Sequence, residues 1–394
     1  MYLKKKISNL FFYFLILSFG YYFTLLKGYG SDGDTFGLIN TFVNFIENDN
    51  YSPSRGYGHP IAELIIGLLS FNFGATVSTF LSFIVFFLSL ILFYFSFDEF
   101  FSEDKLKVFI ILCLSNSLLL FDNINSSDFP WSLFFFSLGF FLMRKEQYFF
   151  CCMFFALSVG CRYNFIIFVY AAIFSHWVIN LGHLNFQKFG IISLGTFFGI
   201  LIIFLPLYFF YSEGISFSFH DRVAVPGQGY NIESLFPRFI YKNFKLFGVY
   251  TSFAILFFIL KEFFYNKKKI LNSIIFKYSI LIILANLIIF FIFPAKISYL
   301  HSGIILIYLI LVFILKKKYL YLLIVLNFLQ WFVSYDLIKI TYKHQDICKP
   351  IHAISAKIDP HYKLGEYFNM LEKISIKDCF SESFSKGLPI KLDY

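Results

Sequence analysis

Two aspartates and an arginine lie in the first long polar interruption of a chain that is otherwise strongly apolar. They are Asp32, Asp34 and Arg55, in the stretch KGYGSDGDTFGLINTFVNFIENDNYSPSRGYGHP, which runs from residue 27 to residue 60. A carboxylate can act as a general base on a hydroxyl group, and a guanidinium can bind a phosphate through two parallel hydrogen bonds. What these side chains can do depends on the elements that hold them and on where they lie relative to a membrane.

The two aspartates also have plainer explanations. Ser31 and Asp34 have the spacing of a helix-capping box, in which Asp34 would only satisfy backbone N–H groups. The sequence DGD has the form of the metal-binding motif of soluble nucleotide-sugar transferases, but there it follows a strand of a Rossmann-like domain, which this chain lacks. Phe36 stands where a calcium-binding loop needs another oxygen ligand. We expect no cofactor. For the two aspartates, Asp32 and Asp34, three roles stay open: general base, helix cap and ligand of a divalent metal ion.

Further polar side chains stand beside apolar runs elsewhere in the chain. They are Asp128 before Pro130, Arg162 in GCRYN, Arg222 in the loop at 212–242, and Lys296, Tyr299 and His301 in FPAKISYLHSG. An aspartate ahead of a helix is often only its N-cap, and an arginine at a helix end often anchors the helix at the membrane interface. A polar loop is often merely solvated. Each of these site candidates therefore has a structural alternative.

The composition excludes an ordinary soluble protein. Of the 394 residues, 58% are apolar and only 14% are charged, whereas soluble domains carry about 25% charged residues. A net charge of +9 would suggest nucleic-acid binding in a soluble protein, but here the basic residues cluster beside apolar runs, as they do at the flanks of membrane helices. We therefore expect a polytopic membrane protein that lies in a lipid bilayer and binds no nucleic acid.

Apolar windows of about 20 residues, the length that crosses the hydrocarbon core, occur about eleven times. The first has a basic flank but no cleavage site, so we expect a retained helix rather than a signal peptide. The stretch 147–182 is too long for one crossing and is expected to break at GCRYN, which places Arg162 at the surface. The predicted spans are 7–26, 75–97, 107–121, 129–143, 147–160, 163–181, 188–211, 243–260, 271–293, 299–315 and 319–335.

The distribution of lysine and arginine sets the expected orientation. With the N-terminus in the cytoplasm, sixteen basic residues fall in cytoplasmic segments, eight in outer loops and nine in the C-terminal tail. The cytoplasmic segments are short, so this excess favours that orientation. Residues 1–335 then form one all-α membrane domain, and residues 336–394 form a short extracytoplasmic tail. Within the tail, the spacing of Cys348 and Cys379 does not decide whether they form a disulfide.

The opening loop predicts two helices that are too short to span. Across residues 34–48, apolar residues fill one half of the helical wheel, and polar residues, Thr41 among them, fill the other half. After a turn-rich segment, a proline is well placed in the first turn of a second helix, with the sequence IAELIIGLLSFNF. Such amphipathic helices lie in the membrane surface. Asp32 and Asp34 would then lie at the outer water boundary, and Glu63 would lie on a solvated face.

The order of these features resembles the GT-C superfamily of polytopic glycosyltransferases, which includes the protein mannosyltransferases and the aminoarabinose transferases. Its members are similar in having a first span, an outer loop with an acidic residue near its start, and two surface helices, with the hinge SRGYGHP between them in this chain. The resemblance is best over the first part of the chain. It continues weakly at NINSSDFPWSLFFFSLGF, at GCRYN and at FPAKISYLHSG.

The resemblance implies an inverting transfer from a polyprenyl-phosphate sugar to an extracytoplasmic glycan, lipid or protein acceptor, in a bacterial inner membrane. Asp34, or as a weaker match Asp32, would act as general base on the acceptor hydroxyl. Many relatives have another acidic residue or an arginine directly after the aspartate that Asp34 matches. This chain has Thr35 there, which weakens a metal role. Arg55, Arg162 and Lys296 would bind the donor phosphate. The substrate-binding residues would include His59, Asp128, Arg222, Tyr299 and His301.

Two other function classes stay open. A polysaccharide polymerase or ligase acting on lipid-linked oligosaccharides would depend on arginines such as Arg222 more than on a carboxylate. A flippase or another transporter of lipid-linked sugars would have charged residues inside its helical core and two related halves. In this chain the charges gather at the ends of the predicted spans, so the glycosyltransferase is the leading hypothesis.

Overall fold

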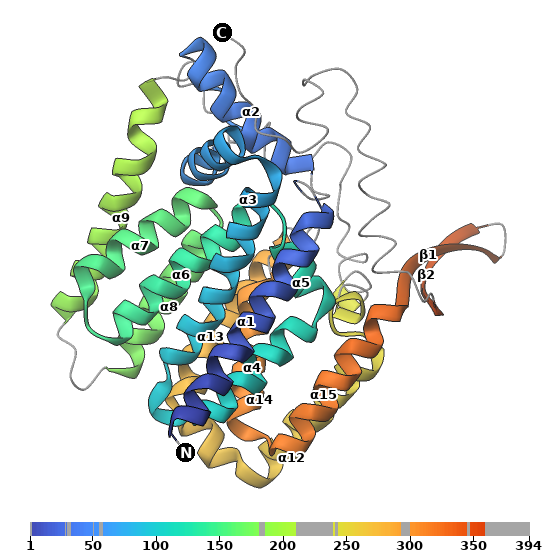
Figure 1. Cartoon of the computed structure of the whole chain (residues 1–394). Helices are drawn as coiled ribbons and strands as arrows, with labels where there is room; N and C mark the ends of the chain where they lie inside the picture. The colour runs from blue at the N-terminus through green and yellow to red at the C-terminus, as the bar shows by residue number, and fades with distance from the viewer. Residues whose placement is uncertain are drawn as a thin grey trace.

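The structure is a computed structural model that describes residues 2–27, 29, 33–49, 51–54, 58–180, 186–209, 239–240, 243–292, 300–344 and 347–358. Its helices form a bundle in which most elements run roughly along one direction (Figure 1). The bundle confirms the predicted all-α class. The N-terminus lies at one end of the bundle, and the helix at residues 33–48 lies at the opposite end.

A helix overlaps every predicted span. In the first part of the chain the elements are α1 (Tyr2–Lys27), α2 (Gly33–Asn48), α3 (Pro60–Phe95), η1 (Asp98–Phe100), α4 (Glu103–Ser115), α5 (Ser117–Asn123), α6 (Asp128–Arg144) and α7 (Tyr148–Cys161). In the second part they are α8 (Phe165–Ile179), α9 (Phe186–Phe209), α12 (Val249–Asn272), α13 (Ile274–Ile292), α14 (His301–Ile314), α15 (Lys317–Leu329) and η3 (Gln330–Phe332). Long apolar stretches favour helix because a helix satisfies its own backbone hydrogen bonds. The expected break around Arg162 is confirmed, but the Arg162 side chain is buried in the protein rather than exposed at its surface.

Three of the described helices, α3, α9 and α12, are long and apolar enough to cross a membrane by themselves. The pair α4 and α5 passes the same test when taken together, although the two helices meet at a bend of 82°. Segments of α1, α7, α8, α13 and α14 are apolar but shorter. These helices support a membrane protein, as the composition indicated.

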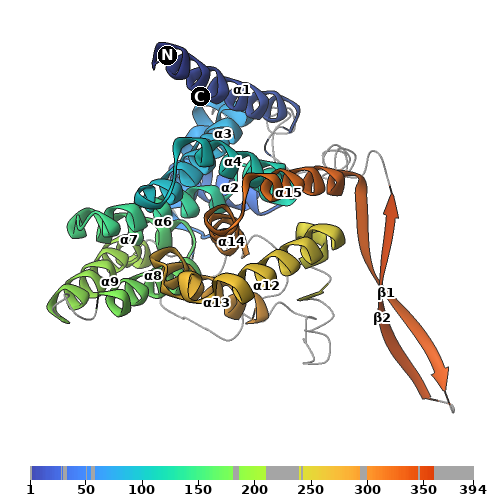
Figure 2. The same ribbon diagram turned by 90° about the horizontal axis from the view of Figure 1, so that it is seen from below.

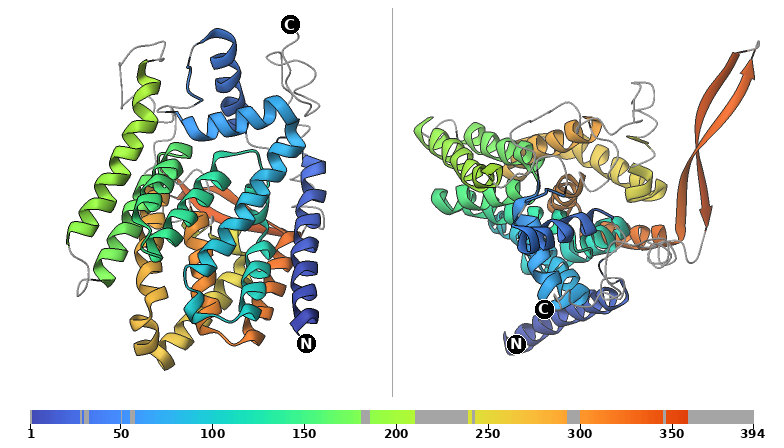
Figure 3. Two further views of the ribbon diagram at one scale, coloured as in Figure 1. Left: turned by 60° about the vertical axis from the view of Figure 1, so that its left-hand side comes forward. Right: turned by 90° about the horizontal axis from the view of Figure 1, so that it is seen from above.

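Helix α3 changes direction at Gly74. This residue has φ 76° and ψ −173°, a conformation that residues with a Cβ atom rarely adopt. Residues 60–73 form a first arm that lies across the end of the bundle, and residues 75–95 form a second arm that runs along it (Figure 3). The bend falls at the boundary that the sequence predicted between a short helix and a span beginning at residue 75.

Helix α2 packs on the first arm of α3, and together these two elements are called the roof. Gly67 permits the close approach, because a Cβ atom there would lie only 2.2 Å from Cβ of Phe42. Thr41, predicted on the polar half of α2, is instead buried. Its hydroxyl donates to the Ser52 carbonyl over 2.8 Å. A small hydrophobic cluster joins the roof to the turn after α1, the second arm of α3 and the end of α7. It is formed by Tyr29, Leu38, Ile39, Val43, Ala62, Ile66, Ala75 and Cys161.

The span predicted at 107–121 is a broken helix. Helices α4 and α5 meet at Asn116, whose side-chain oxygen accepts a hydrogen bond from the Leu119 N–H over 3.0 Å and caps α5. Asn327 Nδ2 donates to Ser115 Oγ over 3.1 Å, and Trp331 Nε1 donates to the Ser115 carbonyl over 2.7 Å. These side chains replace backbone hydrogen bonds that the break removes. Apolar length alone predicted one straight helix and did not reveal these partners.

Two strands follow the bundle, where the sequence predicted the end of the last span and a tail. The strands β1 (Val333–His344) and β2 (Ile347–Ile358) pair antiparallel, with Val333 opposite Ile358. This ribbon projects away from the bundle (Figure 2). The span predicted at 319–335 is therefore too long: α15 ends at Leu329, and β1 begins at Val333 after η3. The alternating sequence VSYDLIKITYKH is typical of a strand, but its polar residues favoured a tail.

Several ion pairs lie at the N-terminal end of the bundle, opposite the roof. They join Arg144 to Glu99, Lys145 to Asp98, Lys188 to Glu146 and Lys317 to Asp104. All four basic residues belong to segments predicted as cytoplasmic. Lys105, from the same predicted side, donates to the Val312 carbonyl over 2.9 Å at this end as well. These basic residues, which the sequence placed in cytoplasmic segments, thus lie together at one end of the folded bundle.

Candidate functional site

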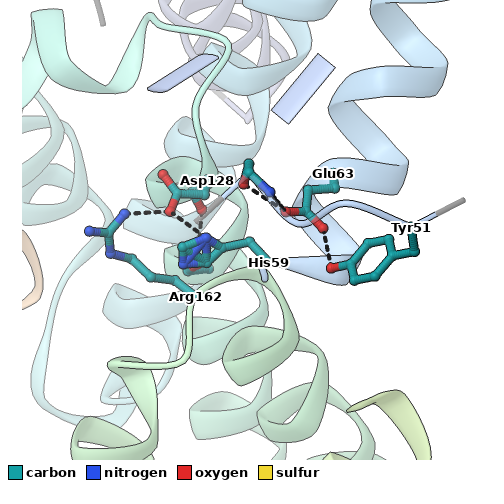
Figure 4. A network of polar contacts seen from close by, with 7 residues as sticks. Tyr51, His59, Glu63, Asp128 and Arg162 are labelled. Carbon is teal, nitrogen blue, oxygen red and sulfur yellow. Dashed lines mark hydrogen bonds and ion pairs between the residues drawn. The ribbon is translucent and has the colours of Figure 1, made fainter. Parts of the chain in front are cut away.

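Asp128 and Arg162 meet beneath the roof (Figure 4). Asp128 is the first residue of α6, and Arg162 directly follows the last residue of α7. Arg162 Nη1 donates to Asp128 Oδ2, and the two side chains are only 3% and 2% exposed. The N-cap position of α6 belongs to Ser127, so Asp128 forms an ion pair rather than the cap that was its structural alternative. A buried carboxylate and guanidinium need each other, because either one alone would be an uncompensated charge.

His59 extends this ion pair towards the roof. Its Nδ1 lies 3.9 Å from Asp128 Oδ2, and its ring stacks on Tyr163, with centroids 5.7 Å apart and planes within 7° of parallel. The His59 carbonyl also accepts a hydrogen bond from the Glu63 N–H over 2.8 Å, in the first turn of α3. Three predicted site residues from separate parts of the chain, His59, Asp128 and Arg162, are thus brought together.

Glu63, which the sequence placed on a solvated face, is buried and holds the segment before α3. Tyr51 Oη donates to Glu63 Oε2 over 2.6 Å. Ser54 donates to Glu63 Oε1 from its backbone N–H, at 3.0 Å, and from its hydroxyl, at 2.6 Å. Gly58 has φ 78°, and a Cβ atom there would lie 2.2 Å from Tyr51 Oη. The solvated-face prediction was wrong because the partners of Glu63 come from the hinge, whose path a helical pattern does not indicate.

A second polar group lies beside the first, at the start of α14. Asn123 Nδ2 lies 3.2 Å from His301 Nδ1, and since an amide nitrogen can only donate, Nδ1 accepts. In the neutral ring the proton is then on Nε2, which lies 3.3 Å from Asp122 Oδ2. The Asp122 side chain is partly accessible, at 32%. Phe129 connects the two groups, because its ring lies 6.1 Å from the His301 ring and 3.7 Å from Cζ of Arg162.

Tyr29 attaches the turn after α1 to this end of the bundle. Its hydroxyl donates to the Ser70 carbonyl over 3.5 Å, and its own carbonyl accepts from the Ser126 N–H over 3.3 Å. Burial raises the pKa of Tyr29 to about 12, so the phenol stays protonated as a donor at neutral pH. The turn after α1, the first arm of α3 and the loop before α6 are thereby joined.

Comparison of the chain with protein-family models, with curated proteins and with solved structures found no match. Functional conclusions therefore rest on the residues of this chain. Within the part of the chain that the structure describes, no group of three or more His, Cys, Asp or Glu side chains is arranged to hold a metal ion.

Part of the predicted site lies outside the described residues. Asp34 belongs to the first turn of α2, and its side chain is outside that part of the structure. The same holds for the possible disulfide, because Cys379 is not among the described residues. The remaining predicted site residues that lie outside are Asp32, Arg55, Arg222, Lys296 and Tyr299.

The sequence reasoning missed two residues of this region, Glu63 and Asp122. The run DNINSSD has an aspartate at each end, and such a polar segment between two apolar runs is a signal that could have identified Asp122. Glu63 is the one acidic residue in the apolar sequence IAELIIGLL. An isolated carboxylate in such a helix indicates a specific partner, since burial without one would be costly.

Proposed function

We propose that the protein is a membrane glycosyltransferase of the GT-C type, which moves a sugar from a polyprenyl-phosphate donor to an extracytoplasmic glycan, lipid or protein. Polar and charged residues inside an apolar helical protein are costly and often mark functional positions. The observation that carries the proposal is the meeting, beneath the roof, of three predicted site residues from different segments, His59, Asp128 and Arg162. A fourth, His301, lies in the neighbouring polar group on the other side of Phe129.

In this proposal the bundle crosses a bacterial inner membrane about eleven times, with the N-terminus in the cytoplasm and the roof outside. The ion pairs of Lys145 and Lys317 support this orientation, because they lie at the end opposite the roof. Short loops rich in lysine and arginine stay on the cytoplasmic side. The roof then lies where a lipid-linked donor and an extracytoplasmic acceptor can both reach it.

The proposed reaction is a displacement at the anomeric carbon of the donor sugar. Asp34 takes the proton of the acceptor hydroxyl, and the hydroxyl oxygen forms the new bond to the anomeric carbon. The bond from that carbon to the phosphate oxygen breaks, and polyprenyl phosphate leaves with the electron pair, stabilised by Arg55 and Lys296. Because Arg162 is already engaged by Asp128, its main contribution is to hold that carboxylate and the turn between α7 and α8 beneath the roof.

The test is sugar transfer by the purified protein in lipid nanodiscs, with a panel of labelled polyprenyl-phosphate sugars and, as acceptors, membranes of a strain that lacks the gene. We expect Asp34→Asn to lower the rate about 100- to 10,000-fold, the usual contribution of a general base. Asp104→Asn, at the opposite end of the bundle, is the matched control and should keep full activity. Full activity in both Asp34→Asn and Asp32→Asn would refute the proposed base, and no transfer with any donor would refute the function.

A transporter of lipid-linked sugars is the second candidate, because one observation favours it. Helices interrupted within the membrane are common in transporters, where they line the substrate path, and α4 and α5 form such a broken pair. Here, however, polar side chains fill the break, because Asn116 and Asn327 both donate to the Tyr308 hydroxyl over 3.1 Å. Movement of a labelled lipid-linked sugar across proteoliposomes without a new glycosidic bond would favour the transporter.

A further inference from the structure

Lysines from three helices come together at the N-terminal end of the bundle, opposite the roof (Figure 1). The start of α4, the end of α12 and the start of α15 each carry more than one lysine. Five of these residues, which the packing of the helix ends brings together, are called the lysine cluster: Lys105, Lys261, Lys269, Lys317 and Lys318.

Two lysines of the cluster lie over the same aromatic ring, that of Tyr319. Lys261 Nζ, from α12, lies 5.4 Å from the ring centroid, and Lys318 Nζ, from α15, lies 5.0 Å from it. The ring itself packs against Phe258 of α12, with centroids 4.9 Å apart. The packing of α12 on α15 therefore places two like charges around one side chain, although like charges repel each other.

The other three lysines meet near the start of α4 and the end of α14. Lys105 Nζ donates to the Val312 carbonyl over 2.9 Å, and Lys269 Nζ lies 5.9 Å from the centroid of the Phe313 ring. Lys105 is also close enough to Lys269 and Lys317 for their positive charges to repel its own. Three ammonium groups, from α4, α12 and α15, thus share one small region.

Few carboxylates balance the lysine cluster. Of its five members, Lys317 alone forms an ion pair with another described residue, and this partner, Asp104, is 68% exposed. Glu262 of α12 accepts a hydrogen bond from an asparagine of its own helix over 2.7 Å instead of pairing with a lysine of the cluster. Two other lysines at the same end, Lys145 and Lys188, are each paired with a carboxylate. Within the described residues, the cluster therefore has an excess of positive charge.

Membrane orientation alone does not require this arrangement. A lysine that only keeps a loop on the cytoplasmic side needs no particular neighbours. Lysines from separate helices that are brought together repel one another, and an anion bound between them offsets that cost. The convergence of α4, α12 and α15 on one region therefore indicates an anionic ligand.

Exposed aromatic side chains beside the cluster distinguish a lipid from a soluble anion. Phe264 and Tyr265 of α12 are 82% and 80% exposed, and they directly precede a kink at Asn266 and the lysines at 267–269. Tyr321, near the start of α15, is 53% exposed. Aromatic side chains next to lysines are typical of a membrane interface. A lipid covers both kinds of side chain, because it has a charged headgroup and apolar chains, whereas a soluble polyanion neutralises only the lysines.

We propose that the lysine cluster binds the phosphate headgroup of an anionic phospholipid, whose acyl chains lie against the exposed aromatic side chains of α12 and α15. Lysine binds phosphate as a point charge, and basic pockets between membrane helices bind anionic headgroups. One headgroup then contacts three helices that are distant in the sequence. This inference concerns the end of the bundle opposite the roof and does not depend on the proposed sugar transfer.

The first test is native mass spectrometry of the full chain, released from neutral detergent micelles after titration with dioleoyl phosphatidylglycerol. Dioleoyl phosphatidylcholine, which has the same chains and no net charge, is the reference lipid. We expect the wild type to bind the anionic lipid at least about tenfold more tightly than the neutral one. The double variant Lys269→Ala with Lys317→Ala should bind the anionic lipid about 30-fold more weakly, because each lysine near an anionic headgroup contributes a factor of about five.

The matched control is the double variant Lys145→Ala with Lys188→Ala, which removes as many charges from the same end of the bundle but outside the cluster. It should bind phosphatidylglycerol as the wild type does, and Lys269→Arg with Lys317→Arg should keep the preference for the anionic lipid. Equal weakening in the two alanine variants would overturn the inference, because binding would then follow total charge. Equal affinity of the wild type for both lipids would also overturn it.

The second test is thermal unfolding in the same micelles, because a lipid that binds only the folded chain raises its unfolding temperature. Without added lipid, we expect the wild type and both alanine variants to unfold within about 1 °C of one another, since exposed lysines contribute little to stability. Phosphatidylglycerol should raise this temperature by more than about 2 °C in the wild type and the control variant, and by less than half as much in the cluster variant. The same rise in all three proteins would contradict the proposed site. Displacement of the lipid by a single-stranded oligonucleotide would show that the ligand is a soluble polyanion instead.

Discussion

The two ends of the bundle carry ion pairs of different kinds. Beneath the roof, the Asp128–Arg162 pair is almost completely buried. At the N-terminal end, the side chains of Lys317 and Asp104 are 48% and 68% exposed, although they form an ion pair of 3.2 Å. Exposed pairs contribute about 0–1 kcal/mol, whereas loss of one partner of a buried pair costs about 3–5 kcal/mol.

This difference separates two uses of charge in one molecule. Exposed lysines at a helix end influence which side of a membrane the end occupies, and for that purpose no particular partner is needed. A buried pair is seldom the most stable filling of its space, so its presence indicates that the position of a particular group matters. The buried pair beneath the roof is therefore the better guide to function.

The largest effect is expected from Arg162→Met, which removes one member of the buried pair and leaves Asp128 without the guanidinium. We expect the free energy of unfolding to fall by about 3–5 kcal/mol, measured by denaturant titration in detergent micelles. The double variant Arg162→Met with Asp128→Leu should recover most of that loss but not the transfer activity. If the free energy of unfolding fell by less than about 1 kcal/mol in the single variant, the buried pair would be worth no more than an exposed one. The two ends of the bundle would then not differ as described.

An intermediate effect is expected between the two ends, where uncharged polar groups fill the break between α4 and α5. Asn327 Nδ2 lies within 3.1 Å of both Ser115 Oγ and Tyr308 Oη. Asn327→Leu leaves these groups without that donor and should lower the free energy of unfolding by about 1–2 kcal/mol. Asn72→Leu is the control, because the Asn72 side chain is exposed and donates to the Leu68 carbonyl within its own helix turn. Equal losses in both variants would argue against a special role of the buried groups.

The smallest effect is expected from Lys317→Ala. Its ion pair with Asp104 is exposed, so the free energy of unfolding should change by less than about 0.5 kcal/mol, and added salt should reduce even that difference. The same denaturant titration at low and at high salt is the measurement. A loss comparable to that of Arg162→Met would show that exposure does not distinguish the two ends.

Much of the helical framework could be predicted from the sequence, because apolar length and periodicity are local properties. The start of α2, the helix beginning at Pro60 and the separation of α7 from α8 around Arg162 all follow from patterns within a few residues. The bend at Asn116 could not be predicted in this way. It depends on hydrogen-bond partners such as Asn327, more than two hundred positions away in the chain.

Only part of the candidate site could be predicted, again because local patterns do not reveal partners that are distant in the chain. Residues that interrupt an apolar run, such as Asp128 and Arg162, stand out in the sequence, although nothing local shows that they pair with each other. Glu63 was misplaced because a glutamate in a short amphipathic helix is normally solvated, and its three donors come from an irregular segment. Asp122 was missed because only the fold brings it next to His301.

The bend at Gly74 has a consequence for the synthesis of the protein. Helix α3 has 36 residues, which as one straight helix would measure about 54 Å, far more than the roughly 30 Å of hydrocarbon that a bilayer offers. A translocon that receives this apolar stretch has several alternative segments of sufficient length to insert. In the proposed membrane orientation, the bend at Gly74 leaves only the second arm, residues 75–95, directed along the bundle to cross the bilayer.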